Sequence, residues 1–280
     1  DLRARDFTIN AMAATLQPTL GDLLDPTGGQ GDLAAQTLRA AYAGAFLDDS
    51  LRVLRGVRLA GALALRWTPE TESLAREALP ALPAVSGERR RDELFNILAL
   101  PRAAQAWAYP LAQEALHAAL SALRDAALSP ALQALSLLEA RFPCSPEASP
   151  WQWLGRFQRA LCGYWWEELS VGRQRLALLK LALLLTAHPQ GEEAARQAAH
   201  ELRLSRPEAA HLRAAVSAAP DGCALMTPLA VHRYYRARGE GGVNAALAAL
   251  VRRLADAPSP QAEQAALRHA EALLTAWFEQ

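Results

Sequence analysis

Helical periodicity runs almost without interruption from about residue 45 to the end of this 280-residue chain, and it constrains the fold more than any other feature. Leu51, Leu54 and Val57 begin the pattern, in which apolar residues recur every three or four positions. Three helix starts carry N-terminal capping signals: Thr68-Pro69-Glu70, Ser129-Pro130 and the capping box from Ser205 to Glu208. Strand-like alternation is hard to find after residue 45. The sequence therefore predicts a mainly α protein of one large or two ordinary domains.

The first 40 residues have a different character. Leu23-Leu24 and the segment 37–40 are expected to be short strands, and Gly28-Gly29 marks a turn between them. This α+β piece is too small to stand alone. The chain begins at Asp1 inside a segment that we expect to be ordered, so we expect a longer gene product. Three prolines within residues 142–150 predict a linker.

Composition excludes several classes of protein. Basic and acidic residues number 29 each, so the chain is not an obligate polyanion-coating protein. The most apolar run, Leu176–Ala187, is shorter than the roughly 20 residues that a membrane span needs and contains Lys180, so it predicts a buried helix. No signal peptide is recognisable. Cys144, Cys162 and Cys223 show no CxxC spacing, which favours free thiols in a reducing cytoplasm over a metal knuckle or a disulfide framework.

Four polar clusters lie within the first 94 residues, and they hold the residues with the strongest chemical interest. In chain order they are DLRARDFTINA (1–11), LDPTGGQGDL (24–33), DDSLRVLRGVR (48–58) and ERRRDEL (88–94). Each cluster alone is modest evidence, because such residues are common on solvated surfaces. Their occurrence together in this order is a strong signal.

The set resembles the class II tRNA nucleotidyltransferase and bacterial poly(A) polymerase family, whose members share RRDFTxNA, DPxGGxxDL, EDxxRxLR and ERxRxEL motifs. The resemblance covers roughly residues 1–100. It implies a small α+β remnant of a polymerase-β-like head, followed by helical neck, body and tail. The expected parts are the C-terminal part of the head (1–40), the neck with the base-reading motif (41–100), helical body (101–145) and body or tail with a degenerate HD-like region (146–280).

Asp49 and Arg52 are candidates for choosing the incoming base. Three residues apart on a helix, they are expected to share a face. A carboxylate accepts from the amino group of cytosine or adenine, and a guanidinium donates to the adjacent ring nitrogen. Uracil and guanine present a carbonyl and an N–H instead, which clash with both groups. The family uses these two positions in this way; the alternative is an ordinary surface ion pair worth less than about 1 kcal/mol.

The resemblance assigns further roles. Arg5, Asp6 and Thr8 resemble the part of the family's site that handles ribose and phosphates, and Arg55 joins the nucleotide-binding set; the alternative for Asp6 is a helix cap. The family usually has arginine where this chain has Ala4, so one contact is either missing or supplied by Arg3. Gly28 and Gly29 are expected to form a hinge between head and neck. The supporting residues, expected to buttress the base-reading helix unless they form only ordinary ion pairs, are Glu88, Arg89, Arg91 and Glu93.

Two expected features are missing from the chain. In the family, the carboxylates that hold two Mg²⁺ ions lie upstream of the first motif, so no catalytic residue is named here and this chain alone is expected to be inactive. In the region that resembles an HD-type phosphohydrolase, Thr186 and Ala187 stand at the His and Asp positions. The six histidines make no ligand cluster, so no metal site is expected.

One stretch in the C-terminal half interleaves basic and aromatic residues. The candidate RNA-binding residues are Arg233, Tyr234, Tyr235, Arg236 and Arg238. Arginines suit phosphates and tyrosines stack on bases, so the stretch is a candidate tRNA contact. The end of a plain amphipathic helix is an equally good interpretation.

The leading hypothesis is a template-independent RNA nucleotidyltransferase that adds CMP, AMP or both to the 3′ end of tRNA, with CTP and ATP as substrates. The motifs do not separate CCA-, CC- and A-adding enzymes from a poly(A) polymerase. A non-catalytic RNA-binding relative is the alternative from another class, and an HD-type phosphohydrolase is disfavoured by Thr186 and Ala187. The expected partners are tRNA and nucleoside triphosphates, with no membrane; the oligomeric state is not predicted.

Overall fold

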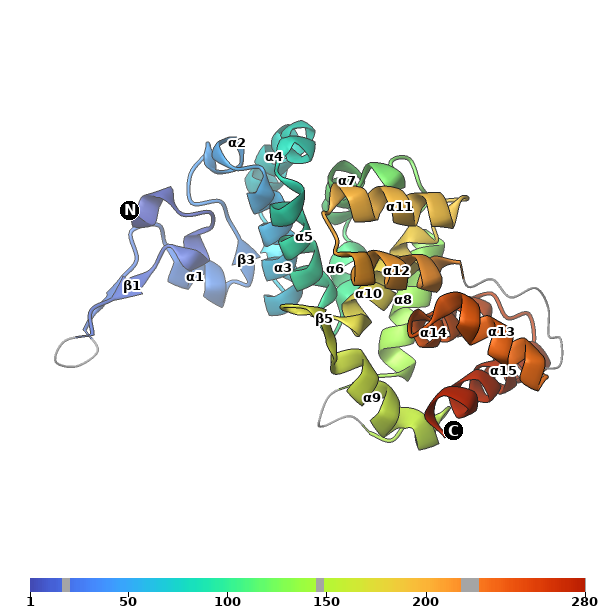
Figure 1. Ribbon diagram of the computed structural model, residues 1–280. Helices are drawn as coiled ribbons and strands as arrows, with labels where there is room; N and C mark the ends of the chain where they lie inside the picture. The colour runs from blue at the N-terminus through green and yellow to red at the C-terminus, as the bar shows by residue number, and fades with distance from the viewer. Residues whose placement is uncertain (17–20, 145–148, 218–226, 280) are drawn as a thin grey trace. The chain divides into compact units, whose positions relative to one another are not determined.

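A computed structural model describes residues 1–16, 21–144, 149–217 and 227–279 (Figure 1). Contacts between Cα atoms divide the chain into two compact units. Unit 1 contains Asp1–Leu100 and Gln105–Leu120, and unit 2 contains Pro101–Ala104 and the chain from Ser121 onward. The predicted mainly α fold with a small β component is confirmed. The division at residues 40, 100 and 145 stays a prediction.

Unit 1 begins with short elements and continues as helices. In chain order they are η1 (Leu2–Ala4), η2 (Thr8–Asn10), β1 (Ala13–Ala14), β2 (Leu23–Leu24), α1 (Gly29–Ala34), β3 (Thr37–Leu38), α2 (Ala45–Asp48), α3 (Leu51–Leu63), β4 (Arg66–Trp67), α4 (Pro69–Ala78), η3 (Leu79–Ala84), α5 (Gly87–Leu98) and α7 (Pro110–Ala119). α6 (Ala103–Trp107) contains the boundary with unit 2. β1 pairs antiparallel with β2, and β3 pairs parallel with β4. The two predicted strands are therefore present.

An aromatic cluster joins the beginning of the chain to α3. The ring centroids of Phe7, Phe46 and Trp67 lie 5.8 to 6.4 Å apart, with edge-on or tilted contacts. Gly56 of α3 faces this cluster, because a Cβ there would lie 2.2 Å from Trp67 Cη2 and 2.8 Å from Phe7 Cζ. The glycine lets α3 approach the rings closely, and this contact fixes α3 against the segment that carries the first motif.

Unit 2 is almost entirely helical. Its elements are η4 (Ser121–Leu123), α8 (Ser129–Arg141), η5 (Gly155–Phe157), α9 (Gln158–Trp166), β5 (Glu168–Ser170), β6 (Arg173–Gln174), α10 (Arg175–Leu185), α11 (Gly191–Glu201), α12 (Arg206–Val216), α13 (Pro228–Arg238), α14 (Gly241–Ala255) and α15 (Pro260–Phe278). Three short strands, β4, β5 and β6, nevertheless follow residue 45, where strand-like alternation is hard to find in the sequence. These strands have two or three residues, too few for an alternating pattern to show.

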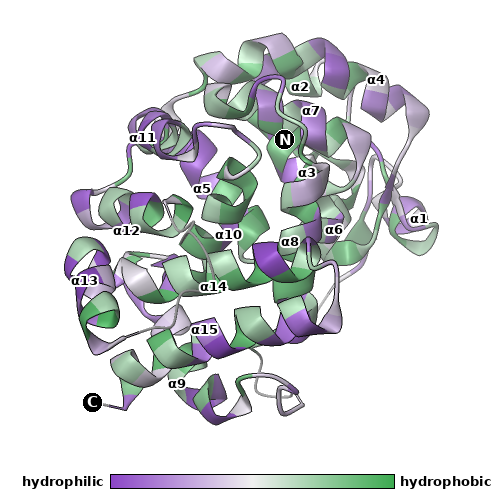
Figure 2. Ribbon diagram, turned by 90° about the vertical axis from the view of Figure 1, so that its right-hand side faces the viewer, coloured by the Kyte–Doolittle hydropathy of each residue, from purple (hydrophilic) through white to green (hydrophobic). Residues whose placement is uncertain are grey.

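Two buried helices form the core of unit 2. α14 is buried from Gly241 to Val251 and packs against α8, α10, α12 and α15. α10 is the buried helix that the apolar run predicts, and Figure 2 shows both helices mainly in the green of hydrophobic residues. Lys180 on α10 is buried and forms an ion pair with Glu139 at 2.7 Å; burial lowers the pKa of the lysine.

The capping predictions have mixed outcomes. Thr68 accepts from the Thr71 backbone and caps α4, and Ser205 and Glu208 form the predicted capping box of α12. Ser129 is not a cap. It is the first residue inside α8, where Leu128 occupies the N-cap position and no side chain caps the helix.

The prediction of free thiols is wrong for two of the three cysteines. Cys144 and Cys162 form a disulfide, with their Cα atoms 5.6 Å apart. The pair joins the residues after α8 to α9. Sequence spacing is a poor guide here, because disulfide formation depends on the distance between the two residues in space. Cys223 and residues 145–148 of the predicted linker lie outside the described residues.

Within the described part of the chain, none of the helices is both long and apolar enough to span a membrane.

Candidate nucleotide-binding site

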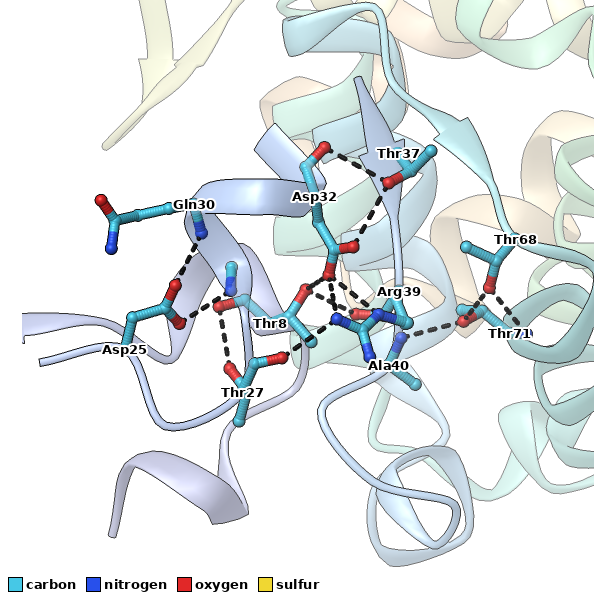
Figure 3. Close-up of polar contacts among 11 residues, drawn as sticks. Thr8, Asp25, Thr27, Gln30, Asp32, Thr37, Arg39, Ala40, Thr68 and Thr71 are labelled. Atoms are coloured by element: carbon cyan, nitrogen blue, oxygen red, sulfur yellow. Dashed lines mark hydrogen bonds and ion pairs between the residues drawn. The ribbon is translucent and has the colours of Figure 1, made fainter. Parts of the chain in front are cut away.

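The first two motifs meet in unit 1 around the carboxylate of Asp32, as Figure 3 shows. Thr8 Oγ1 donates to Asp32 Oδ2 at 2.6 Å, and Arg39 Nε donates to the same oxygen at 2.9 Å. Arg39 Nη2 also donates to the Thr27 carbonyl at 3.0 Å. These bonds link η2, the turn before α1, α1 itself and the end of β3. They hold the segment with Arg5 and Asp6 in a defined position.

The glycine pair lies at the beginning of α1. The Asp25 carboxylate accepts from the backbone N–H groups of Gly29 and Gln30 at 2.7 and 2.9 Å, and these backbone hydrogen bonds, with that of Gln30 first, lower the pKa of Asp25. Gly28 has φ +80°, a conformation that favours glycine. A Cβ at Gly29 would lie 2.2 Å from the carbonyl oxygen of Thr8. Local geometry thus requires both glycines, and their hinge role stays a prediction.

Asp49 does not lie on the same helix as Arg52, contrary to the sequence prediction. It has extended dihedral angles (φ −153°, ψ 99°) and precedes α3, which begins at Leu51. Its Oδ1 accepts from the Leu51 backbone at 3.2 Å, and its Oδ2 forms an ion pair with Arg89 of α5 at 2.7 Å. The two residues are nevertheless neighbours, because the Arg52 backbone N–H donates to the Asp49 carbonyl at 3.0 Å.

Arg52 is held by neutral groups. Its Nη1 donates to Tyr42 Oη at 3.0 Å and to the Ala45 carbonyl at 3.1 Å. Its Nη2 donates to the carbonyl of Ala4, in the first motif, at 3.4 Å. No ion pair joins Arg52 to Asp49 within the ranges that the structure covers, so the alternative of an ordinary surface ion pair between them does not describe the geometry.

Glu93 of α5 binds two arginines of α3. Its two carboxylate oxygens accept from Arg55 Nε at 3.2 Å and from Arg58 Nε at 3.1 Å, and Glu93 is itself buried. Arg55 Nη1 also lies 3.7 Å from Asp6 Oδ2, so this residue of the third motif connects Glu93 of the fourth motif to Asp6 of the first. Asp6 Oδ1 accepts from the Phe7 backbone at 2.9 Å and from the Asn10 amide at 3.3 Å. Glu93 thus lies where a buttress of α3 is expected.

The remaining motif residues have varied surroundings. Thr8 is buried with its hydroxyl bound to Asp32, so any role toward a nucleotide would come from the segment it fixes. Arg5 and Glu88 are exposed. Arg91 forms an ion pair with its neighbour Asp92 at 2.9 Å.

The pair at the start of α3 keeps hydrogen-bonding capacity for a ligand. A carboxylate offers about four acceptor positions, and Asp49 gives one contact per oxygen to Leu51 and Arg89. Arg52 uses both Nη1 hydrogens and one Nη2 hydrogen, which leaves the second Nη2 hydrogen. The side chain of Asp49 is 22% exposed. One acceptor residue and one donor residue, adjacent at the start of α3, therefore keep capacity for a further hydrogen bond.

The C-terminal candidates divide into packed and exposed residues. Tyr234 is buried and donates to the Gly242 carbonyl at 2.8 Å, and Tyr235 donates to the Leu273 carbonyl at 2.8 Å with its ring 5.0 Å from that of Trp277. The expected stacking on bases does not fit these two packed rings. Arg238 lies over Tyr234, whereas Arg233 and Arg236 are exposed.

Among residues 1–16, 21–144, 149–217 and 227–279, no group of three or more His, Cys, Asp or Glu side chains is arranged to hold a metal ion. The described residues therefore offer no cluster of that size for the Mg²⁺ ions that the resemblance implies. Thr186, at the His position of the HD-like segment, follows α10 and donates to the Leu183 carbonyl at 2.6 Å.

Sequence reasoning missed several residues of this site. Tyr42 and Arg39 lie between motifs, where no pattern marks them. Arg58 carries a usable signal, since it follows Arg55 by three residues and therefore faces the same neighbour on α5. Asp32 is part of the second motif, but its bond to Thr8 spans 24 residues.

Comparisons with known proteins show which families and folds this chain is similar to. Residues 1–39 match the family model described as the poly A polymerase head domain. A CC-adding tRNA nucleotidyltransferase of Geobacter sulfurreducens is 48% identical over 103 residues, which cover 37% of this chain and 24% of that protein. A CC-adding tRNA nucleotidyltransferase of a Synechocystis species is 30% identical over 246 residues, which cover 84% of this chain and 52% of that protein. The chain thus spans about a quarter to a half of these relatives.

Solved structures show the same fold. That of a CCA-adding enzyme with ATP matches all of this chain and 61% of its own chain, with a TM-score of 0.67 and 23% identity.

Proposed function

Since the chain belongs to the class II tRNA nucleotidyltransferase and poly(A) polymerase family, we propose that it is the base-selecting and RNA-binding part of a template-independent nucleotidyltransferase. The enzyme adds CMP, AMP or both to the 3′ end of tRNA in the cytoplasm, with CTP and ATP as substrates. Residues 1–40 are the C-terminal part of its head. The carboxylates that hold Mg²⁺ belong to a part of the protein outside this chain.

One observation carries the proposal. At the start of α3, Asp49 has spare lone pairs and Arg52 has a spare Nη2 hydrogen, and separate partners hold the two side chains. Asp49 accepts the N4 amino group of cytosine or the N6 amino group of adenine. Arg52 donates to N3 of cytosine or N1 of adenine. A uracil or guanine would set a carbonyl against the carboxylate and an N–H against the guanidinium, leaving polar groups unpaired.

The other members of the site support this pair. Arg89 holds Asp49, and Glu93 holds Arg55 and Arg58 on the same face of α3. Arg5, which directly precedes Asp6, is exposed, and its guanidinium suits a phosphate oxygen. On α13, Arg233 and Arg236 are the candidates for contacts with the RNA backbone.

The test is incorporation of labelled nucleotides by the purified gene product that carries this chain, with Mg²⁺ present. CTP and ATP are offered separately and together, on tRNA lacking CCA and on tRNA ending in CC. CMP alone indicates CC addition, a single AMP on CC indicates A addition, and both in order indicate CCA addition. Long AMP tails on unrelated RNA indicate a poly(A) polymerase. RNA binding without any incorporation would overturn the proposal in favour of a non-catalytic relative.

A further inference from the structure

Tyr42 lies between two charged residues of the third motif without belonging to that motif. Its hydroxyl accepts from Arg52 Nη1 at 3.0 Å and donates to Asp48 Oδ2 at 2.5 Å. The guanidinium carbon of Arg52 also lies 5.9 Å from the centroid of the Tyr42 ring. A single tyrosine thus contacts Arg52 through both its hydroxyl and its ring, while Asp48 determines where the hydroxyl hydrogen points.

The donors of Arg52 can be counted. Nη1 has two hydrogens, and Tyr42 Oη and the Ala45 carbonyl take both. Nη2 gives one hydrogen to the Ala4 carbonyl. Nε is buried without a partner in the described part of the chain. The second hydrogen of Nη2 is therefore the donor left for a ligand, and the direction in which it points depends on the contacts that fix Nη1.

We propose that Tyr42, oriented by Asp48, is a positioning residue that aims the free Nη2–H of Arg52 at the ring nitrogen of the incoming cytosine or adenine. The inference rests on the proposed function, because it assumes that Arg52 reads the base. It adds a specificity-determining residue that the motif does not contain.

A tyrosine hydroxyl suits this task better than a direct carboxylate contact. An ion pair between Asp48 and Arg52 would offset the guanidinium charge and give its hydrogens a competing acceptor. The neutral hydroxyl holds Nη1 and leaves the charge available to the base. Because Tyr42 donates its only hydrogen to Asp48, its oxygen presents a lone pair to Arg52.

The test measures the selectivity ratio of the gene product, which is kcat/KM for CTP over that for UTP if the enzyme uses CTP, or for ATP over that for GTP if it uses ATP. Tyr42→Phe keeps the ring and removes the hydroxyl, so it should lower this ratio about tenfold, the effect of losing one bond to a charged group. Tyr109→Phe is the matched control. Tyr109 donates to Glu72 at 2.7 Å in the same unit, without contact to Arg52, and its loss should leave the ratio unchanged. Melting temperatures establish that each variant is folded.

Arg52→Ala separates failure of this inference from failure of the proposed function. If Arg52→Ala lowers the ratio about 100-fold and Tyr42→Phe lowers it about tenfold, both stand. If Arg52→Ala lowers the ratio and Tyr42→Phe matches Tyr109→Phe, Tyr42 is a structural residue and only this inference falls. If Arg52→Ala leaves the ratio intact, the base-reading role falls and the inference with it.

Discussion

Two polar networks, one in each unit, differ in how completely their groups are paired. In unit 1, Asp49 and Arg52 lie near the surface and keep a free lone pair and a free N–H. In unit 2, Asn244 is fully buried. Its amide donates to the Arg175 carbonyl at 2.8 Å and to His211 Nε2 at 3.0 Å, and its oxygen accepts from Trp165 Nε1 at 2.9 Å.

The difference is the one expected between the proposed binding site and a structural framework. A buried polar group stabilises the fold only if its polar atoms find partners inside the protein, as the amide nitrogen and the oxygen of Asn244 do. A group that recognises a ligand must keep one hydrogen bond unmade until the ligand arrives. Changes in unit 2 should therefore cost stability, and changes at Asp49 or Arg52 should cost selectivity.

The largest effect is expected at the centre of the unit 2 network. Asn244→Ala leaves the buried Trp165 Nε1 without its partner and removes the side-chain bonds to the Arg175 carbonyl and to His211, so the free energy of unfolding should fall by about 3 kcal/mol or more. Arg89→Ala removes a half-exposed ion pair in unit 1 and should cost less than about 1 kcal/mol. Urea unfolding of both variants checks this. Equal losses of unfolding free energy in the two variants would contradict the expectation that the buried network stabilises the fold more than the exposed one.

Acid should destabilise the unit 2 network through His211. Burial, with a smaller contribution from Arg175, lowers the pKa of this histidine to about 4. With the hydrogen of the neutral ring on Nδ1, Nε2 accepts from the Asn244 amide, so a proton added to Nε2 would face that donor. The unfolded chain binds the proton more readily. The stability that neutral His211 contributes is therefore full above about pH 6.5 and is lost as the pH falls toward about 4, in total about 3 kcal/mol.

The check is the difference in unfolding free energy between the protein and His211→Gln across this pH range. The variant should lose less stability on acidification. The exposed His200 offers a control, since His200→Gln should follow the unmodified protein. Parallel curves for the protein and His211→Gln would contradict the assignment.

A smaller effect concerns the fit of α3 against the aromatic cluster. Gly56→Ala places a Cβ within 2.8 Å of Phe7 and Trp67, and this overpacking should cost about 1–3 kcal/mol. Gly163 on α9 is a matched control, because a Cβ there meets no atom within 4 Å. Gly163→Ala should be neutral or stabilise by up to about 1 kcal/mol. Thermal unfolding measures both; a stabilising Gly56→Ala would rule out the close approach.

The smallest effect on stability is expected on α13. Arg236→Ala should change the free energy of unfolding by no more than about 0.5 kcal/mol, because the side chain is exposed. If Arg236 contacts an RNA phosphate, the variant should bind tRNA more weakly whatever the tRNA sequence. The slope of the logarithm of the binding constant against the logarithm of salt concentration should then fall in magnitude by about one. Filter binding at several salt concentrations measures the slope. An unaltered slope removes Arg236 from the RNA contacts.

Much of the fold could be predicted because its signals are local. The buried helix α10, the cap of α4 and the capping box of α12 each depend on residues within one element. The disulfide between Cys144 and Cys162 could not be predicted, because it depends on where α9 lies relative to the end of α8. The tyrosines of α13 show the same limit, since one amphipathic stretch serves equally for packing or for binding.

The same limit holds for the candidate site, where local motifs could be recognised but contacts between distant segments could not. The motifs single out Asp49, Arg52 and Glu93 as candidates without any knowledge of distances, and the roles of these residues stay predictions. They did not show that Asp49 lies outside α3, because Asp48, Asp49 and Ser50 are all residue types that suit an N-cap and the sequence does not show which of them precedes the helix. Arg39 and Tyr42 could not be predicted, because each lies between motifs and contacts a motif residue that is distant in sequence.

The central claim is that Asp49 and Arg52 choose the base. Its most direct test is the ratio of kcat/KM for CTP over UTP, or ATP over GTP, in the gene product and in its Asp49→Ala variant. The account predicts that the ratio falls at least about 100-fold in the variant, because the amino group loses its acceptor and the wrong carbonyl loses its repulsion. A ratio that stays within about twofold of the unmodified enzyme, in a variant that melts at the same temperature, would contradict it.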